Sequence, residues 1–376
     1  MKIAGNFGTR VFFGMCGVVA GALAAGCASG KAGADVKLTA AEERAARKMV
    51  AAAEKAYAGV VEAEARRPRT LVSLDLEMEW SRNLANAQAL VTPSAPERTW
   101  ALQGHLDRLN KMEAAPAAGA VPGAGIPGDT DALEYARAQG EFALASEGAT
   151  GAMTPAMERW AEAMAGAAER AYAVLLRTPE NLLVTPEYVE LRLAWLRRRA
   201  RAEMLLMPTA VKRLPVLEAN ERRMREAAAW VERVRATAAP ASRYQADYAV
   251  AEAEYLAEMN GGTGKTLTVE QREAAERMAA SAEMARRGLE EIAAKGPRTP
   301  ELLQVIMTYS RRVAEAGMAL HGKGAERRRV VEDYLKRTQQ TEAMANAWVN
   351  PSEANVYALM AGYAVAEAEY WVASER

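Results

Sequence analysis

A glycine-rich stretch with a lysine is the first segment of this sequence whose residue types could do chemistry. Gly261–Thr266 contains the glycines, lysine and threonine that a phosphate-binding loop needs, since backbone amides and a lysine bind phosphate oxygens there. The pattern GxxxxGK[ST] also requires a glycine at position 259, which is Met259, and a preceding strand where this sequence indicates a helix. The stretch therefore predicts a linker, and no nucleotide ligand is expected.

Histidine and cysteine, the usual protein ligands of zinc and haem, are scarce. His105 and His321 are the two histidines, neither has a second histidine three or four residues away, and both cysteines lie in the first 27 residues. No metal or haem site is expected from such a set. Both histidines are interpreted as structural, and His321 stands at a predicted helix end, where the helix dipole favours an imidazole.

Two pairs of glutamates could be considered for acid–base catalysis. They are Glu252 with Glu254, and Glu367 with Glu369. Residues two apart on a helix point to different faces, so the carboxylates of one pair cannot converge on one bond. Both pairs are interpreted as solvated surface. The sequence also lacks a GxSxG nucleophile motif, and neither enzymatic activity nor a cofactor is predicted.

Aromatic residues recur at equivalent places along the chain. The two sets are Trp80, Trp195 and Tyr309, and Tyr135, Tyr248 and Tyr363. They could form a seam between packed helices or line a groove that holds a ligand. A packing seam is the expected role, since each unit of a repeat protein buries its apolar face against its neighbours. Solvent exposure of these rings would favour the groove.

Cys27 is a candidate for lipidation. Lys2 and Arg10 precede an uncharged stretch of about 16 residues, which is short for a membrane span and typical of the core of an export signal. This stretch ends Leu23-Ala24-Ala25-Gly26-Cys27, which resembles the lipobox of bacterial lipoproteins. Ala24 stands where that family usually has leucine, and Leu23 lies one place further out. The alternative is an ordinary signal peptide cut near Ala24 or Ala25, with Cys27 left as a thiol.

The lipobox resemblance implies how the mature chain is attached. In that family the signal is cut before the cysteine, which then carries acyl chains such as palmitate. This assigns 1–26 to a signal peptide and 27–39 to a lipidated tether, whose glycine, alanine and serine content is typical of a flexible linker. Ala28 stands where aspartate often marks inner-membrane retention in that family. The resemblance therefore implies an outer-membrane lipoprotein that faces the periplasm, with the cell surface also open.

Composition narrows the class of protein. The chain has 376 residues, of which 50% are hydrophobic but 6% aromatic, so its core is expected to be helical and built from small side chains. Lys plus Arg and Asp plus Glu number 48 each, which gives a net charge of zero. Without a basic excess, no nucleic-acid partner is expected.

A threefold repeat supplies the elements that must position these residues. The eight residues Tyr248–Tyr255 recur letter for letter as Tyr363–Tyr370, 115 residues later, and a looser copy starts at Tyr135. Many other positions, including the aromatic set that starts at Trp80, recur with spacings of 115 and then 114. Such self-similarity indicates duplication. The predicted repeats are 40–149, 150–260 and 261–376.

Each repeat is expected to hold four helices. Met278, Ala282, Ala285 and Leu289 are spaced in fours and threes, the pattern of a helix that packs along a partner. Gly296, expected in the left-handed conformation, and the capping residues that start at Thr299 indicate a short turn between antiparallel helices. The fold class is therefore all-α, with six hairpins in three tandem repeats and no β-barrel. An elongated bundle or a solenoid is expected, and whether it closes into a ring is left open.

The hairpins resemble the helical part of TolC-type outer-membrane efflux factors. The residues that carry this resemblance are Gly296, Thr299, Leu302, Leu303, Ala316 and Leu320. In that family a glycine-bearing turn, a polar cap and a ladder of leucine and alanine recur in long antiparallel helices. The alternating segments of its membrane barrel are missing here. The resemblance implies a periplasmic rod or ring that docks against other helices, and it transfers no functional residue.

These observations predict a non-enzymatic, outer-membrane-anchored periplasmic lipoprotein that acts as a scaffold or adaptor in the cell envelope. Efflux or transport is the process that the resemblance implies. The expected partners are a membrane, reached through the lipid on Cys27, and an envelope protein. The alternative is a periplasmic module that binds a small ligand or a peptide in a groove between stacked repeats.

Overall fold

The computed structural model describes most of the chain after residue 37. The described residues are 38–92, 94–114, 128–147, 149, 152–177, 184–236, 238–260, 267–296, 298–322, 324–348 and 356–375. They contain helices and no strand, which confirms the all-α class. The signal peptide, Cys27 and the glycine-rich stretch 261–266 lie outside the described residues, as does the tether except for its last two residues.

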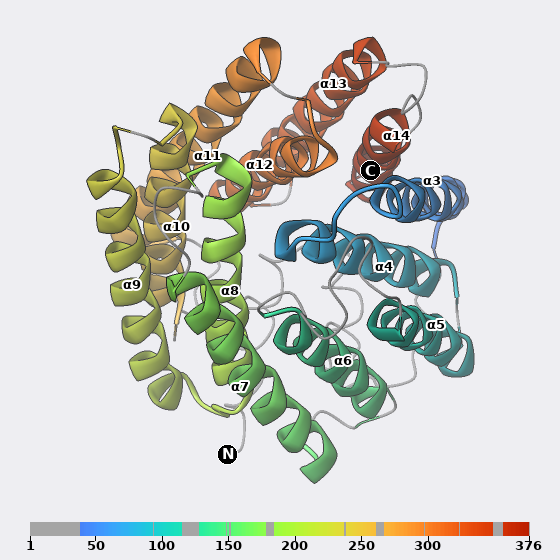
Figure 1. Ribbon diagram of the computed structural model, residues 1–376, viewed down its shortest axis with the longest axis horizontal. Helices are drawn as coiled ribbons and strands as arrows, with labels where there is room; N and C mark the ends of the chain where they lie inside the picture. The colour runs from blue at the N-terminus through green and yellow to red at the C-terminus, as the bar shows by residue number, and fades with distance from the viewer. Residues whose placement is uncertain are drawn as a thin grey trace.

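Three successive groups of four helices make up the described part of the chain. The first repeat holds α3 (Ala40–Glu64), α4 (Leu71–Val91), α5 (Ala95–Ala114) and α6 (Asp129–Ser146). The second holds α7 (Pro155–Arg177), α8 (Pro186–Leu205), α9 (Ala210–Arg233) and α10 (Pro240–Met259). The third holds α11 (Val269–Lys295), α12 (Pro300–Leu320), α13 (Ala325–Ala347) and α14 (Val356–Ser374). Consecutive helices pack against each other as antiparallel neighbours (Figure 1).

The repeats form a closed ring, because the last helix packs along the first. α14 lies beside α3 (Figure 1). A Cβ atom on Gly59 would lie 3.0 Å from the side chain of Leu359, so this residue allows the two helices to approach closely. The Lys48 ammonium also binds the Glu369 carboxylate at 2.6 Å across the same junction. The repeats therefore close into a ring and do not form an open solenoid.

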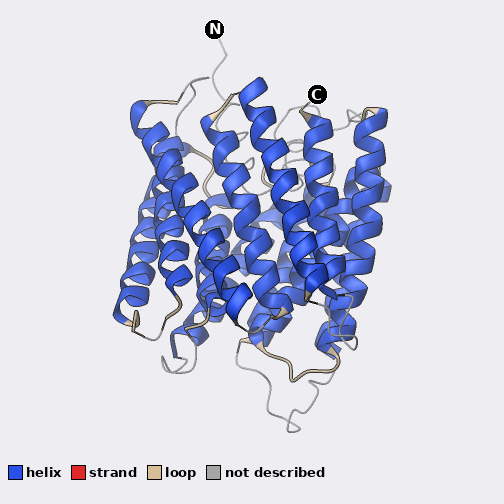
Figure 2. Ribbon diagram, turned by 90° about the horizontal axis from the view of Figure 1, so that it is seen from above, coloured by secondary structure: helices blue, strands red, loops and turns tan. Residues whose placement is uncertain are grey.

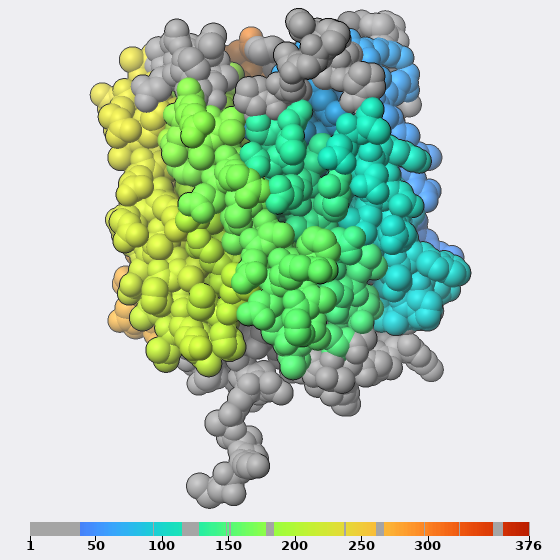
Figure 3. Space-filling model, turned by 60° about the horizontal axis from the view of Figure 1, so that its bottom comes forward, coloured from blue at the N-terminus to red at the C-terminus, as the bar shows by residue number. Residues whose placement is uncertain are grey.

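The ring has two ends with different helix termini. Leu38 precedes α3 at one of them, and α5, α7, α9, α11 and α13 also begin there; we call it the entry end. The even-numbered helices begin at the opposite, far end. An ion pair from Arg98 at the start of α5 to Glu147 after α6 lies at the entry end, and Figure 2 shows the helices running between the two ends. Seen from outside, consecutive helices form a continuous wall (Figure 3).

The predicted seams and caps explain why these residues form these helices. Met278, Ala282, Ala285 and Leu289 are fully buried on one face of α11, as predicted. Threonine side chains cap seven helices by accepting a hydrogen bond from a backbone N–H of the first turn. These residues are Thr39, Thr70, Thr154, Thr185, Thr209, Thr268 and Thr299.

The expectation for Gly296 was wrong. Its φ is −119° and its ψ is −166°, which is extended backbone rather than the left-handed region. The Gly296 N–H donates to the Ile292 carbonyl at 2.7 Å and closes the last turn of α11. An extended residue suffices here because the chain leads within three residues to the cap of α12 at Thr299.

The second helix of each repeat lies nearest the ring axis. α4, α8 and α12 contact one another in addition to their sequence neighbours, and all three run from the far end to the entry end. α8 is the most buried helix, and its buried residues include Glu190, Arg192, Arg197 and Arg198. Buried charges are rare unless they are paired. The buried charges therefore make the centre of the ring the candidate functional site.

Candidate functional site

The aromatic residues predicted as a seam or a groove lie in the core. The exposed fractions are 1% for Trp80, 0% for Trp195 and Tyr309, 3% for Tyr135, 2% for Tyr248 and 5% for Tyr363. Their rings meet edge to face in three pairs: Trp80 with Tyr363 at 5.2 Å, Trp195 with Tyr135 at 5.4 Å, and Tyr309 with Tyr248 at 5.6 Å between ring centroids. Each pair joins the second helix of one repeat to the fourth helix of the preceding repeat. These residues therefore form the seam between repeats rather than the lining of a groove.

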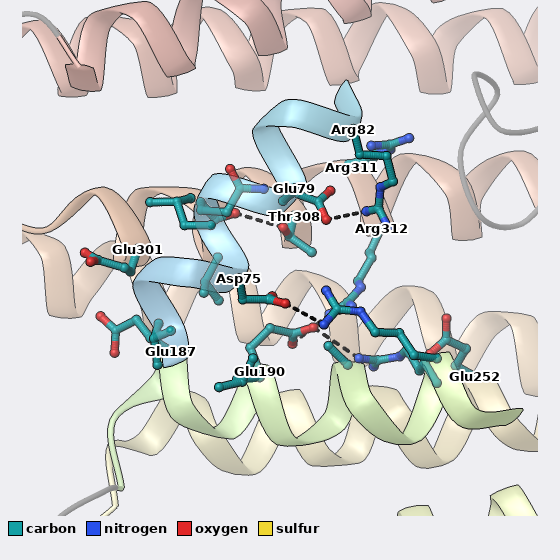
Figure 4. Close-up of a pocket in the computed structure, with 18 of the residues that line it drawn as sticks. Asp75, Glu79, Arg82, Glu187, Glu190, Glu252, Glu301, Thr308, Arg311 and Arg312 are labelled. Atoms are coloured by element: carbon teal, nitrogen blue, oxygen red, sulfur yellow. Dashed lines mark hydrogen bonds and ion pairs between the residues drawn. The ribbon is translucent and has the colours of Figure 1, made fainter. Parts of the chain in front are cut away.

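A cavity of about 180 Å³ lies among the axial helices, and its lining is charged (Figure 4). α4, α8 and α12 supply most of the lining, and α10 adds Glu252. The carboxylates are Asp75, Glu79, Glu187, Glu190, Glu252, Glu301 and Glu315. The guanidiniums are Arg82, Arg197, Arg198, Arg201, Arg311 and Arg312. The two signs nearly balance, with seven carboxylates against six guanidiniums.

The charged side chains follow the repeat. Arg82, Arg197 and Arg311 occupy equivalent positions of α4, α8 and α12, with the spacing of 115 and then 114, and we call them the arginine layer. Seven residues earlier on each helix, nearer the far end, stand Asp75, Glu190 and Gln304. A spacing of seven returns to the same face of a helix that packs in a bundle, where apolar residues are usual. The axis of this ring is polar instead.

Glu190 is the centre of the buried network. Its carboxylate accepts hydrogen bonds from Arg312 at 2.6 and 2.9 Å, from Arg197 at 3.1 Å and from the Tyr309 hydroxyl at 2.9 Å. The Arg312 guanidinium also lies over the rings of Tyr309 and Tyr248, 4.6 and 5.0 Å from their centroids. Burial alone would raise the pKa of Glu190, but Arg312 and Arg197 bring it below its ordinary value. Glu190 therefore remains ionised.

The interpretation of both glutamate pairs as surface was wrong for one member of each. Glu252 is 8% exposed and accepts a hydrogen bond from Arg197, while Glu367 is 2% exposed and lies 3.4 Å from Arg311. Their partners two residues later point outward, as the helix geometry requires: Glu254 pairs with arginines on α9 and α11, and Glu369 pairs with a lysine of α3. The inward members complete the axial network through the arginine layer.

Two residues that line the cavity each have one buried atom without a hydrogen-bond partner among the described residues. One is Nη2 of Arg197, a side chain 7% exposed whose Nε and Nη1 atoms donate to Glu252 and Glu190. The other is Oε1 of Gln304. The first is a donor and the second an acceptor, and a buried group of either kind is costly to leave unpaired. Both atoms are buried, and neither has surface that is accessible from the cavity.

His105 belongs to a separate buried cluster between α4 and α5. Its Nδ1 atom lies 2.8 Å from the Ser81 hydroxyl, which also accepts a hydrogen bond from Nε of Arg108 at 2.8 Å. Ser81 therefore donates to a neutral imidazole. Burial chiefly, followed by the charges of Arg108 and Arg82, lowers the pKa of His105 to about 3.

This pKa predicts a loss of stability in acid. In the unfolded chain the histidine has its ordinary pKa of about 6.5, so protons favour the unfolded state as pH falls from about 6.5 towards about 3. The contribution is fully present above pH 6.5 and decreases by about 1.4 kcal/mol per unit below it. Urea unfolding of the wild type and of His105→Gln at pH 7 and 5.5 should differ in pH dependence by about 1 kcal/mol. Parallel pH dependence of the two proteins would contradict this assignment.

His321, the other histidine, makes different contacts from those of His105. His321 follows α12 as its C-terminal cap, and its Nδ1 atom lies 3.0 Å from the Glu326 carboxylate at the start of α13. Among the described residues no group of three or more histidine, cysteine, aspartate or glutamate side chains is placed to hold a metal ion.

Sequence reasoning missed the arginine layer, although a signal for it was present. Arg82, Arg197 and Arg311 align at the same spacing as the aromatic seam, two residues after Trp80, Trp195 and Tyr309. On a single helix, a charge at a repeated position resembles a solvated side chain. Only the packing of three helices about one axis brings them together.

The comparisons with known proteins do not assign this chain to a family. No protein-family model matches it, and no curated protein matches it. One solved structure, from work described as "Computational Design of Self-Assembling Cyclic Protein Homooligomers", is similar at 15% identity and covers 88% of this chain and 96% of its own. Its TM-score of 0.14 is too low to support any argument about fold or function. In the described part of this chain, no helix combines the length and the apolar character that crossing a bilayer requires.

Proposed function

We propose that this protein is a lipid-anchored, non-enzymatic ring that stands on the periplasmic side of a bacterial outer membrane and acts as a scaffold or adaptor in the envelope. The supporting observation is that the exposed apolar side chains gather at the end of the ring where the chain enters. The lipobox at Cys27 supports the same arrangement.

Five large apolar side chains are exposed at the entry end. They precede or belong to the first two turns of α5, α7, α9 and α11, and they are Trp100, Met153, Val211, Leu214 and Val269. The most exposed are Val211 at 82% and Trp100 at 73%. The described residues show two others elsewhere, Leu176 at the far end and Met284 in the middle of α11. Apolar residues gathered at one end favour contact with a partner or a membrane.

The tether selects the membrane as the occupant of this end. Ten residues lie between Cys27 and Leu38, and a glycine-rich linker of that length spans about 20 Å on average. Acyl chains on Cys27 would hold the entry end, rather than the far end, against the bilayer. Trp100 is suited to the interface, where an amphipathic ring contacts both lipid and water. Lys212, beside Val211, is placed to meet anionic headgroups.

The outer wall supports a scaffold role because it is exposed and charged. Arg225 on α9 binds Glu221 of its own helix and Glu254 of α10, and Arg277 of α11 binds Glu254 as well. Such exposed pairs contribute little to stability. They instead keep the wall soluble. A partner protein would recognise the wall by its pattern of charges.

Anchoring is tested by fractionation of cells that express the full chain. The wild type is expected in the membrane fraction and Cys27→Ser in the soluble fraction, since each buried methylene of an acyl chain contributes about 0.8 kcal/mol. Mass spectrometry of the N-terminal peptide reads acylation directly. An unmodified Cys27 in the wild type would remove the anchor from this proposal.

A matched control separates the apolar end from the lipid. On the Cys27→Ser background, vesicles of phosphatidylethanolamine and phosphatidylglycerol should bind Trp100→Asp and Val211→Asp severalfold more weakly than the parent. Leu176→Asp is the control, because Leu176 is 52% exposed but lies at the far end. Equal losses for the entry-end and far-end variants would contradict membrane contact at the entry end.

A further inference from the structure

The second and third repeats contain the same buried ion pair. The identical octapeptides of α10 and α14 place Glu252 and Glu367 at equivalent positions. Glu252 accepts a hydrogen bond from Arg197 of α8, and Glu367 lies 3.4 Å from the equivalent Arg311 of α12. Glu367 also accepts a hydrogen bond at 2.9 Å from the Tyr334 hydroxyl of α13. The same pair can therefore be compared in two surroundings.

One turn later on the second helix, the two repeats carry opposite charges. Arg201 of α8 and Glu315 of α12 stand at equivalent positions, four residues after the arginine layer, and both line the cavity. Burial alone would raise the pKa of Glu252, but Arg197 chiefly, with a contribution from Arg201, brings it below its ordinary value. In the third repeat the corresponding neighbour of Glu367 is the Glu315 carboxylate. That repeat therefore has repulsion where the second has attraction.

Glu315 shares its arginine with Glu367. Nε of Arg311 donates to the Glu315 carboxylate at 3.2 Å, and Nη1 of the same guanidinium lies 3.4 Å from Glu367. Glu367 is buried, and the Glu315 side chain is 11% exposed. Two carboxylates that share one guanidinium leave a negative charge without full compensation, which is costly in a buried site. A proton on one of them removes this charge.

The surroundings assign the proton to Glu315. The groups that face Glu315 or line the cavity beside it are Arg311 and Arg312 of α12, Arg201 of α8, Glu252 and Tyr248 of α10, Tyr334 of α13, Glu367 of α14, and Glu79 and Arg82 of α4. Burial chiefly, together with Glu367 and Glu252, raises the pKa of Glu315 to about 7 against the opposing effect of Arg311. Glu367 has a second donor in Tyr334, whereas Arg311 is the one hydrogen-bond donor to Glu315 among the described residues. Glu315 is therefore the carboxylate that takes the proton.

The proton acts on the helix that closes the ring. Glu315 belongs to α12 and Glu367 to α14, and α14 packs along α3 (Figure 1). When Glu315 is protonated, Arg311 pairs with Glu367 alone. When Glu315 is ionised, two carboxylates repel each other across the contact between α12 and α14. The docking of α14 is therefore strongest when Glu315 holds its proton.

We propose that Glu315 is a proton-binding site that strengthens the docking of α14, and with it the closure of the ring, as pH falls through neutrality. The ring would then respond to the pH of its surroundings in addition to serving as a scaffold. This inference does not depend on the lipid on Cys27 or on membrane contact, so failure of either leaves it unaffected.

The direction of the pH effect on stability follows from the two states of the chain. The folded protein keeps the Glu315 proton up to about pH 7, whereas the unfolded chain releases it at the ordinary pKa of 4.5. Between these values the folded state binds more protons than the unfolded state. Its stability therefore falls as pH rises through this window, and the loss is complete above about pH 7.

Urea unfolding of the full chain tests the site, with Cys27→Ser as the parent so that no lipid is attached. Glu315→Gln keeps the shape of the protonated acid and cannot ionise. Relative to this variant, the unfolding equilibrium constant of the parent should increase about tenfold from pH 5.5 to 7.5. The opposite effect of His105 is common to both proteins and cancels in the comparison. Parallel pH dependence of the two proteins would overturn the proposal.

Two further variants distinguish a shared arginine from burial alone. Glu367→Gln leaves Arg311 to Glu315, so Glu315 should titrate at lower pH and the pH dependence of stability between pH 5.5 and 7.5 should shrink. Glu291→Gln, on the exposed face of α11, is the control and should retain the pH dependence of the parent. An unchanged pH dependence in Glu367→Gln would show that the two carboxylates do not share a site.

The proton and the docking of α14 can each be read directly. The infrared carbonyl band of a protonated carboxyl group should be stronger in the parent than in Glu315→Gln at pH 5.5, and this difference should vanish well above pH 7. Amide protection of α14, corrected for intrinsic exchange rates, should fall over the same range in the parent but not in Glu315→Gln. Constant protection of α14 in the parent would overturn the link to ring closure.

Discussion

Replacement of Glu190 by glutamine is expected to lower the free energy of unfolding by about 3–5 kcal/mol. The carboxylate holds Arg312 through two hydrogen bonds and Arg197 through one, and all three side chains are about nine-tenths buried. Glutamine keeps the shape but removes the negative charge, so it leaves buried guanidiniums without full compensation. Breaking a buried pair in this way costs far more than the pair contributes relative to apolar residues.

Urea unfolding at pH 7 measures this effect against a matched surface variant. Glu43→Gln removes a carboxylate that pairs with Arg47 on α3, where the two side chains are 49% and 68% exposed. Glu43→Gln should lower the free energy of unfolding by no more than about 0.5 kcal/mol. A Glu190→Gln protein no less stable than Glu43→Gln would mean that water in the cavity compensates the arginines.

Trp80→Ala is expected to cost about 3–5 kcal/mol and to loosen the closure of the ring. Trp80 is 1% exposed, and its ring meets Tyr363 of the last helix edge to face at 5.2 Å. The contact joins the first repeat to the third. Part of the lost stability comes from the cavity that the substitution leaves in the core. The rest comes from losing the aromatic pair, which contributes about 0.5–1.5 kcal/mol.

A double-mutant cycle separates these two parts. Trp80→Ala, Tyr363→Phe and the double variant report the coupling across the closure. Trp195→Ala supplies the comparison, because Trp195 makes the same contact with Tyr135 within the chain rather than between its first and last repeats. If closure adds stability, α3 and α14 should exchange amide hydrogens faster in Trp80→Ala than in Trp195→Ala. Equal exchange in both variants would show that the ring does not depend on this contact.

Local patterns made much of the fold predictable. The spacing of Met278, Ala282, Ala285 and Leu289 on α11 depends on the helix alone, and the caps at Thr185 and Thr299 depend on a few adjacent residues. The internal repeat then extended the prediction from one hairpin to six. Closure could not be predicted, because it depends on the small angle between successive repeats, which no single residue determines.

The candidate site depended on a relation between helices that the sequence does not record. Arg197 and Glu252 are 55 residues apart, and Arg312 and Glu190 are 122 apart. On its own helix each resembles a solvated charge. They become a buried network only because α4, α8 and α12 face one axis. Lipidation of Cys27, by contrast, is predicted from the sequence alone, and Cys27 lies outside the described residues.

Covalent linkage of the three repeats makes the polarity of the axis possible. Three identical subunits around a threefold axis would place the same side chain three times at every level, for instance three carboxylates at the level of Glu190. Joined copies can diverge, and at that level this chain has Asp75, Glu190 and Gln304, two acids and an amide. Unlike residues at one level of the axis are therefore open to a fused pseudo-trimer and closed to a homotrimer.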